Sequence, residues 1–250
     1  MIKIENVKVF GLDEALAGNC LSYDRDKMPN HEEVKLLKKL TIAGPSHAKA
    51  LRQIFVTMKI TAPMYWWKEM DTYKVATVRN SSSTMHTICK KEFKPEDFSF
   101  DNSTETVNAY IEWMVQQLNS MRKIYLEGLV EDGNVLVEPK DKDIWRSIIQ
   151  MLPSSYNQTA VWTGNYETLA NIVEQREGHK LLEWNNFIER CKELPKSDLI
   201  FARNNVRKEK NLLLMEYMKL GSLENLKKII SGEKESNEET TNTNLDEVEK

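Results

Sequence analysis

The feature that most constrains the fold of this chain is a short apolar strand that leads directly into a helix. Residues 51–60 (LRQIFVTMKI) are apolar and rich in β-branched side chains, and Pro45 and Pro63 bound them, so they predict a buried strand. Pro63 also suits the first turn of a helix over residues 64–74, because proline at that position gives up no intrahelical hydrogen bond. A strand that feeds a helix indicates a fold with both kinds of element.

The same arrangement recurs later in the chain. Residues 156–163 (YNQTAVWT) predict a strand, Gly164-Asn165 ends it, and residues 166–176 resume helical spacing. Near-alternating apolar residues predict an edge strand over residues 2–9. The other expected elements are amphipathic helices over 31–42, 104–124, 144–152, 181–194 and 211–230, a short strand over 135–137 and a polar loop over 79–84.

Length and charge bound the class of protein. The 250 residues hold 35 Lys+Arg and 38 Asp+Glu, and the formal net charge of -3 gives no bulk electrostatic reason to expect a nucleic-acid coat. Residues 231–250 carry seven acids and two lysines, which leaves residues 1–230 at +2. This last segment is too poor in apolar residues to pack, so we expect one folded domain over 1–230 and a disordered acidic tail over 231–250.

The cysteines and the N-terminus indicate a reducing compartment. Cys20, Cys89 and Cys191 are odd in number and widely spaced, so neither a disulfide framework nor a zinc ribbon is expected. The first ten residues lack the pattern of a signal peptide, and no apolar run approaches the roughly 18 residues of a membrane span. We expect a cytoplasmic protein without a membrane partner.

Signature motifs of the common enzyme classes are missing from the sequence. It contains no G-x-G-x-x-G, P-loop, H-E-x-x-H or G-x-S-x-G. The four histidines, at positions 31, 47, 86 and 179, are too scattered to predict a metal site. Without a basic stripe, the small positive charge of residues 1–230 does not support nucleic-acid binding either.

The segment over residues 62–86 is a candidate ligand site, because it is dense in aromatic, hydroxyl and cationic side chains. Tyr65, Trp66 and Trp67 offer flat apolar surfaces with polar edges. Cations and hydroxyl donors follow at Lys68, Lys74, Arg79, Ser81, Ser82, Ser83 and Thr84. This mixture suits a planar anionic ligand such as a nucleotide. The alternative is that the tryptophans belong to the core and the serines form a turn.

A second candidate lies at the second strand-to-helix junction. Thr163, Gly164 and Asn165 precede the N-terminus of the helix over 166–176, where free N–H groups can bind anionic or amide-rich groups. Arg176 stands at the C-terminal end of that helix, where the helix dipole stabilises a cation. A purely structural role for these residues fits the sequence equally well.

The order and spacing of the two clusters resemble those of the flavin-dependent thymidylate synthases. The resemblance runs from Leu21 to Leu194 and includes HEEVKLLKKL, GPSHAKALRQ, and I-x-AP with Tyr65. Its most specific part reads LP-x-x-Y, then WT-x-N, L-x-N and R, with His179 behind it. That string stands at Leu152, Pro153, Tyr156, Trp162, Thr163, Asn165, Leu169, Asn171 and Arg176.

The resemblance implies a fold and a reaction. The fold would be an α+β domain of the thymidylate synthase-complementing type, helix-rich with a mixed or antiparallel sheet, assembled as a homotetramer with sites between subunits. The reaction would methylate dUMP at C5 to give dTMP. The carbon would come from methylenetetrahydrofolate, and the hydride from FAD that NADPH has reduced.

The resemblance also implies roles for individual residues. Arg176 matches the arginine that pairs with the uracil and favours its N3-deprotonated form, so it is the expected catalytic residue. The expected nucleotide-binding residues are Glu69, Arg79, Ser81, Ser82, Ser83, Thr84 and Arg176, with Ser82 beside the phosphate. The expected FAD-binding residues are His47, Lys49, Thr72, Tyr73, Lys74, Asn80, Asn165, Glu167 and Asn171.

The chain departs from the family's signature, R-H-R-x-x-S-x-N-E-x-S-x-R-Y, which falls on residues 72–85 (TYKVATVRNSSSTM). Ser82 is identical and Lys74 keeps a cation. The four cationic positions that have become neutral or acidic are Thr72, Thr84, Ile149 and Glu167, and a glutamine has become Glu69. The cations near enough in sequence to compensate are Lys68, Arg79 and Arg146.

Three functions therefore stay open. The first is a divergent flavin-dependent thymidylate synthase. The second is a related flavin or folate enzyme that acts on another pyrimidine nucleotide. The third is a catalytically inactive homologue that keeps the scaffold and binds a nucleotide or serves as a structural protein.

Overall fold

The computed structural model describes residues 2–21, 30–101 and 103–219 of the chain. Contacts separate a compact unit, Met1–Asn204, from a second unit that begins at Asn205. The described part of the second unit is the remainder of the last helix, α9 (Asp198–Lys219). The expected acidic tail, the end of the expected helix over 211–230, and the expected domain boundary at residue 230 lie outside the described residues.

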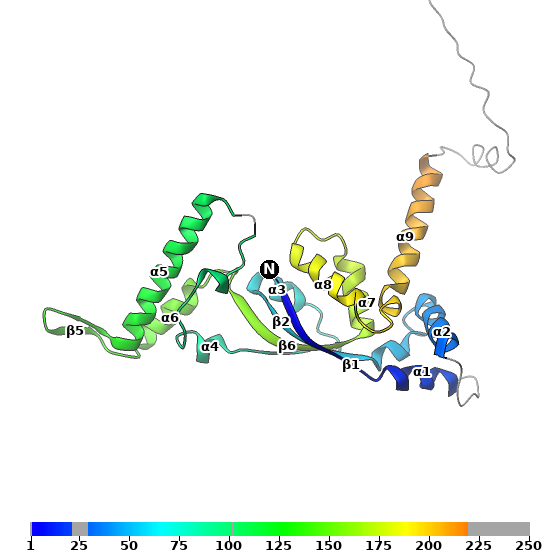
Figure 1. Cartoon of the computed structure of the whole chain (residues 1–250), viewed down its shortest axis with the longest axis horizontal. Helices are drawn as coiled ribbons and strands as arrows, with labels where there is room; N and C mark the ends of the chain where they lie inside the picture. Colours follow the sequence, from blue (N-terminus) through cyan, green and yellow to red (C-terminus); the bar gives the residue numbers. More distant parts are fainter. Residues whose placement is uncertain (1, 22–29, 102, 220–250) are drawn as a thin grey trace, which may run out of the picture. The chain divides into compact units, whose positions relative to one another are not determined.

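A four-stranded antiparallel sheet organises the first unit. The strands lie in the order β1 (Lys3–Phe10), β2 (Phe55–Pro63), β6 (Asn157–Asn165) and β3 (Val78–Ser81). Figure 1 shows β2 and β6 side by side, and they pair along their whole length, from Phe55 opposite Asn165 to Pro63 opposite Asn157. The two strands predicted from the strand-to-helix junctions are therefore neighbours, and the strand predicted over residues 2–9 lies at the edge of the sheet.

Two helices follow the paired strands at opposite ends of the pair. Helix α3 (Met64–Met70) follows β2, and α7 (Tyr166–Arg176) follows β6. With 11 residues at 1.5 Å each, α7 is about 16 Å long. It runs back toward α3, because Arg176 at its end bonds to Glu69 of α3. The antiparallel pairing thus brings the two candidate segments together.

The core covers one face of the sheet. Alternate residues of β2 and β6 point into it, and α7 and α8 (Leu182–Lys192) pack there. Four tryptophans are fully buried or nearly so: Trp66, Trp67, Trp162 and Trp184. The tryptophans of the segment over 62–86 are therefore core residues, as the alternative interpretation held.

A second hydrophobic cluster lies around α5 (Glu105–Glu127) and α6 (Lys142–Met151). Thr104 caps α5 and Gly128 ends it, as the sequence predicts. A hairpin of β4 (Leu129–Glu131) and β5 (Asn134–Val137) separates the two helices. The remaining elements are α1 (Leu12–Leu21), α2 (Asn30–Ala43), η1 (Lys49–Arg52), α4 (Thr84–Thr87) and η2 (Pro95–Asp97).

Four local predictions were wrong in their extent. The helix predicted from residue 211 begins at Asp198, because Leu199, Ile200 and Phe201 pack into the core as its first turns. The strand predicted from residue 51 begins at Phe55, because Leu51 and Gln53 bond three residues back in a 3-10 turn. Helix α3 ends at Met70, where the Thr72 hydroxyl donates to the Glu69 carbonyl at 2.7 Å and closes the last turn. The loop predicted over 79–84 overlaps strand β3 and the first residue of α4. The polar residues of β3 form a strand because β6 supplies the ladder.

The three cysteines are buried and none forms a disulfide. Along the described stretches of the chain, no helix combines the length and the apolar character needed to cross a bilayer.

Candidate functional site

Arg176 lies at the centre of a cluster that joins α7, α3 and α8. Its Nε donates to the Tyr73 hydroxyl at 2.8 Å, and its Nη1 donates to Glu69 Oε2, also at 2.8 Å. The guanidinium carbon lies 4.9 Å from the centre of the Trp184 ring, within the range of a cation–π contact. The side chain is 19% exposed, so the ion pair is only partly screened by water.

Glu69 is the common hydrogen-bond acceptor of this cluster. The indole N–H of Trp184 donates to its Oε2 at 2.7 Å, and His179 Nε2 lies 3.7 Å from the same oxygen. The backbone N–H of Leu181 donates to His179 Nδ1 at 3.1 Å, and His179 Nε2 also lies 3.3 Å from Arg176 Nη1. We call Glu69, Tyr73, Arg176, His179 and Trp184 the Arg176 cluster.

The Arg176 cluster holds its arginine in a paired state. Two of the guanidinium nitrogens are engaged, whereas Nη2 donates no hydrogen bond to any residue that the structure describes. A ligand carbonyl or anion can therefore reach Nη2 without breaking the bond to Glu69. The same bond means that a pyrimidine would meet a carboxylate together with the cation.

A recess beside α7 gathers most of the expected FAD-binding positions. It has a volume of about 440 Å³, within the roughly 300–1,000 Å³ of known ligand pockets. Its lining residues are Arg52, Thr72, Tyr73, Lys74, Val75, Ala76, Asn165, Glu167, Thr168, Asn171 and Gln175. We call it the α7 recess. It adjoins the Arg176 cluster, because Tyr73 belongs to both.

Six of the nine expected FAD positions line the α7 recess: Thr72, Tyr73, Lys74, Asn165, Glu167 and Asn171. The other three, His47, Lys49 and Asn80, are not among its lining residues. Lys49 lies in η1, and Asn80 lies in β3 opposite Val161.

Cations in the α7 recess exceed acids by one. Glu167 is held by Arg52, with Nε donating to Oε2 at 2.6 Å. Lys74 forms no ion pair with a residue in the described ranges. The sequence analysis missed Arg52, because nothing in the sequence shows that η1 packs beside α7.

The loop at the mouth of the α7 recess has free backbone donors. The N–H groups of Val75 and Ala76 donate no hydrogen bond within the described chain. Ala76 adopts a φ of 57°, a left-handed conformation that turns the loop sharply. Successive free N–H groups next to a lysine form an anion-binding concavity, so these residues fit the diphosphate of a dinucleotide.

Asn165 and Asn171 also have partners within the chain. The Asn165 side chain caps α7 by accepting from the backbone N–H of Thr168 at 2.9 Å. Asn171 Oδ1 accepts from Arg203 Nη2 at 3.2 Å. The side-chain oxygen of each asparagine thus already accepts a hydrogen bond within the chain. The side-chain N–H groups of Asn165 and Asn171 are the donors that a ligand could use.

The expected nucleotide-binding residues do not lie together in one chain. Glu69 belongs to the Arg176 cluster, whereas Ser82 lines a different recess. Arg79 pairs with Asp71, donates to the Gln158 side chain and stacks 4.3 Å from the centre of the Trp67 ring. The remaining three are Ser81, opposite Ala160 in the sheet, Ser83, at the N-cap position of α4, and Thr84, the first residue of α4.

The recess that Ser82 lines is basic. Its volume is about 890 Å³, and its lining residues are Ser82, Thr87, Ile88, Lys90, Lys91, Glu92, Phe93, Lys94, Asp97, Arg122 and Tyr156. We call it the basic recess. It shares no lining residue with the α7 recess. Of the seven expected nucleotide-binding residues, Ser82 alone is among its lining residues, so within one chain these seven do not line one pocket.

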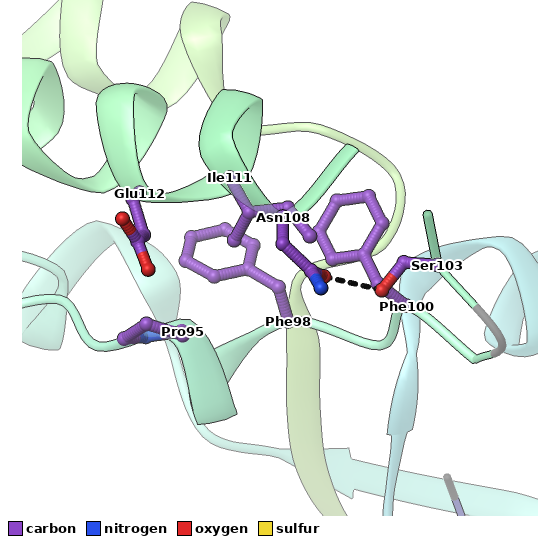
Figure 2. Close-up of a pocket in the computed structure, with 7 residues that line it drawn as sticks. All are labelled: Pro95, Phe98, Phe100, Ser103, Asn108, Ile111 and Glu112. Atoms are coloured by element: carbon purple, nitrogen blue, oxygen red, sulfur yellow. Dashed lines mark hydrogen bonds between the residues drawn. The ribbon is translucent and has the colours of Figure 1, made fainter. Parts of the chain in front are cut away.

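A third recess, of about 280 Å³, is largely apolar. Figure 2 shows Phe98, Phe100 and Ile111 around it, with Ser103 bonded to Asn108. The one charged residue among those that line it is Glu112. A cavity with this lining does not fit an anionic ligand. A fourth recess, of about 270 Å³, shares Ile88, Lys90 and Arg122 with the basic recess and adjoins it. We therefore treat the α7 recess and the basic recess as the candidate sites.

The fold and these recesses can be compared with known proteins. No protein-family model matches the chain, and no curated protein matches its sequence. Solved structures do match it. Two of them are structures of thymidylate synthase X (ThyX) from Helicobacter pylori, both with FAD and dUMP.

The match to these structures extends over most of both chains. Each has a TM-score of 0.59 and 15% sequence identity, and covers 81% of this chain and 97% or 98% of the ThyX chain. At this identity the likeness shows the fold, which is helix-rich α+β with an antiparallel sheet. The expected fold class is confirmed.

Proposed function

We propose that the chain is a divergent flavin-dependent thymidylate synthase that binds FAD and a pyrimidine nucleotide. The observation that carries the proposal is the α7 recess, where six positions implied by the motif resemblance line one cavity. The motif resemblance implies these positions without reference to the fold, and the solved ThyX structures that share the fold contain FAD and dUMP.

Different residues of the α7 recess would bind different parts of FAD. Lys74 and the backbone N–H groups of Val75 and Ala76 would hold the diphosphate, and Asn171 would contribute its amide. Bound FAD would supply hydride-transfer chemistry. The proposal includes NADPH as reductant, methylenetetrahydrofolate as carbon donor, a homotetramer, a cytoplasmic location and a domain over residues 1–230.

Arg176 would act on the pyrimidine. A fixed cation beside the ring stabilises negative charge that develops on the base, and it does so best where water is excluded. Tyr73 and Glu69 hold the guanidinium in one orientation, and Nη2 stays open to the ligand. The remaining expected nucleotide contacts, among them Arg79 and Ser82, belong to the same proposal.

A second candidate is the inactive homologue that keeps the binding sites. The observation in its favour is the pairing of cations with acids. Arg52, Arg79 and Arg176 bond to Glu167, Asp71 and Glu69, respectively. Charge-assisted bonds contribute roughly 1.5–3 kcal/mol each, so cations already neutralised attract a dinucleotide less strongly.

Flavin content tests the proposal directly. The purified full chain should show flavin absorption bands, or take them up with added FAD, and release one FAD per chain on denaturation. Lys74→Ala should weaken FAD binding about tenfold, the effect of roughly one lost charge-assisted bond. The matched control is Lys39→Ala, an exposed lysine on α2, which should leave FAD binding unchanged.

Turnover separates the two candidates. Protein loaded with FAD should release tritium from C5-labelled dUMP in the presence of NADPH and methylenetetrahydrofolate, and Arg176→Ala should abolish the release. Release from C5-labelled dCMP instead would favour another pyrimidine as substrate. FAD binding with no release from either nucleotide would favour the inactive homologue, and a chain that takes up no FAD would refute both flavin enzymes.

A further inference from the structure

The basic recess carries the largest group of unpaired cations around any recess described above. Four cations, Lys90, Lys91, Lys94 and Arg122, line it against two acids, Glu92 and Asp97. None of the three lysines forms an ion pair with a residue that the structure describes. A concave surface with this excess of positive charge favours an anionic ligand.

The acids of the basic recess do little to neutralise the lysines. The Asp97 carboxylate accepts the backbone N–H of Lys94 at 2.9 Å, which caps the short helix η2. Glu92 is exposed, and its carboxylate pairs with no described cation. Arg122 is fixed, because its Nε donates to the Cys89 carbonyl at 3.0 Å, and its two terminal nitrogens have no partner in the described part of the chain.

Beside the cations lies a flat apolar wall with hydroxyl groups. Tyr156 and Phe93 line the recess, and Phe98 packs behind both, 5.7 Å from the Tyr156 ring centre and 6.4 Å from that of Phe93. Burial, with a smaller effect from Asp97, raises the pKa of Tyr156 above its usual range, so its O–H stays a donor near neutral pH. Ser82 adds a second hydroxyl.

We propose that the basic recess binds a phosphorylated ligand of nucleotide size, with the phosphate held by the lysines and Arg122 and the ring against Tyr156. Its volume of about 890 Å³ lies within the range of pockets that take such ligands. Lysine ammonium groups and a fixed guanidinium are the donors that phosphate oxygens require.

This inference deepens the proposed function and rests on it for one residue, Ser82, which is already expected beside the nucleotide phosphate. The lysines lie outside every stretch for which the motif resemblance implies a role, and binding at the basic recess does not require a flavin. It also explains how the chain can recognise a phosphate although Thr84 and Ile149 replace two signature arginines. Ser82, the one position identical to the signature, opens into this recess.

Calorimetric titration of the full chain tests the inference. The probes are dUMP and AMP, with deoxyuridine and inorganic phosphate as partial ligands. We expect both nucleotides to bind and both partial ligands to bind at least tenfold more weakly. The double variant Lys90→Gln/Lys91→Gln should raise the Kd for the nucleotides roughly tenfold or more, because two cations are lost from the phosphate site.

The matched control is Lys35→Gln/Lys39→Gln, which removes the same charge from an exposed face of α2. The inference is overturned if neither nucleotide binds, if both double variants weaken binding equally, or if phosphate alone binds as tightly as dUMP. All four changed lysines are exposed, so thermal unfolding should show folded variants.

The outcomes also separate this inference from the proposed function. Nucleotide binding that depends on Lys90 and Lys91 in a chain that takes up no FAD supports the inference and refutes the flavin enzyme. FAD uptake, together with nucleotide binding that is unchanged in Lys90→Gln/Lys91→Gln, supports the flavin enzyme and overturns the inference.

Discussion

Replacing Glu69 by glutamine tests whether the Arg176 cluster is held together by charge. The variant Glu69→Gln keeps the size of the side chain and an acceptor oxygen, and glutamine is the residue that the motif resemblance implies at this position. It removes the negative charge that Arg176 and Trp184 contact at 2.8 and 2.7 Å. We expect the free energy of unfolding to fall and Arg176 to stay in place.

The magnitude follows from the exposure of the pair. A hydrogen bond to a charged group contributes roughly 1.5–3 kcal/mol when buried. The side chains of Glu69 and Arg176 are 33% and 19% exposed, so water screens part of the attraction. We therefore expect a loss of about 1–2 kcal/mol, which in a domain of this size lowers the melting temperature by roughly 2–4 °C per kcal/mol.

A double-mutant cycle in urea isolates the pair from its surroundings. The chains are the wild type, Glu69→Gln, Arg176→Gln and the double variant, each compared at an unchanged m value. The expected coupling energy is about 1 kcal/mol. A coupling below about 0.3 kcal/mol, the usual error of additivity, would show that the pair is not a stabilising unit and would refute the reasoning.

Three further predictions concern stability and reactivity. Gly164→Ala should cost about 1–3 kcal/mol in urea unfolding, because a Cβ at that position would lie 2.3 Å from the Trp162 ring. In Gly18→Ala the new Cβ would meet only the Gln53 side chain, at an ordinary contact distance of 3.8 Å, so this change should cost nothing. The pKa of Tyr65 is raised, mainly by burial and then by its bond to Glu183. The contribution of Tyr65 to stability should therefore be constant below about pH 10 and be lost as the pH rises above it, so stability should fall less at high pH in Tyr65→Phe. A thiol reagent at neutral pH should label none of the three buried cysteines until urea unfolds the chain: Cys20, Cys89 and Cys191.

The elements with a strong period were predictable from the sequence. Helix α5 has a capping threonine, a long apolar stripe and a terminal glycine, and all three signals agree with its observed bounds. Helix α7 begins at Tyr166 and ends at Arg176, as the spacing of its apolar residues predicts. The elements that the sequence analysis missed have no such agreement: α1 spreads small and polar residues along its length, and β3 is a strand only because β6 pairs with it.

The candidate site was predictable only in part, for a related reason. Three expected positions on the loop after α3 (Thr72, Tyr73 and Lys74) and three at the start of or along α7 (Asn165, Glu167 and Asn171) fell into one recess. The motif resemblance, not local spacing, linked these two distant segments. The individual bonds between distant segments could not be predicted from local spacing, because they depend on the pairing of β2 with β6. The bonds of Arg176 to Glu69 and of Arg52 to Glu167 each join residues more than 100 positions apart.

The pattern of paired and unpaired cations decides where an anion can bind. The three arginines near the motif positions each face an acid, and such pairs offer an incoming phosphate less attraction than free cations do. Of the cations in the two candidate recesses, those without an acid partner in the described chain are Lys74, Lys90, Lys91, Lys94 and Arg122. If these cations recruit the ligands, neutralising Lys74 should affect the flavin alone and neutralising Lys90 and Lys91 the nucleotide alone. Equal losses of both ligands in either variant would mean that the two recesses act as one site, as they would if a second copy of the chain brought them together.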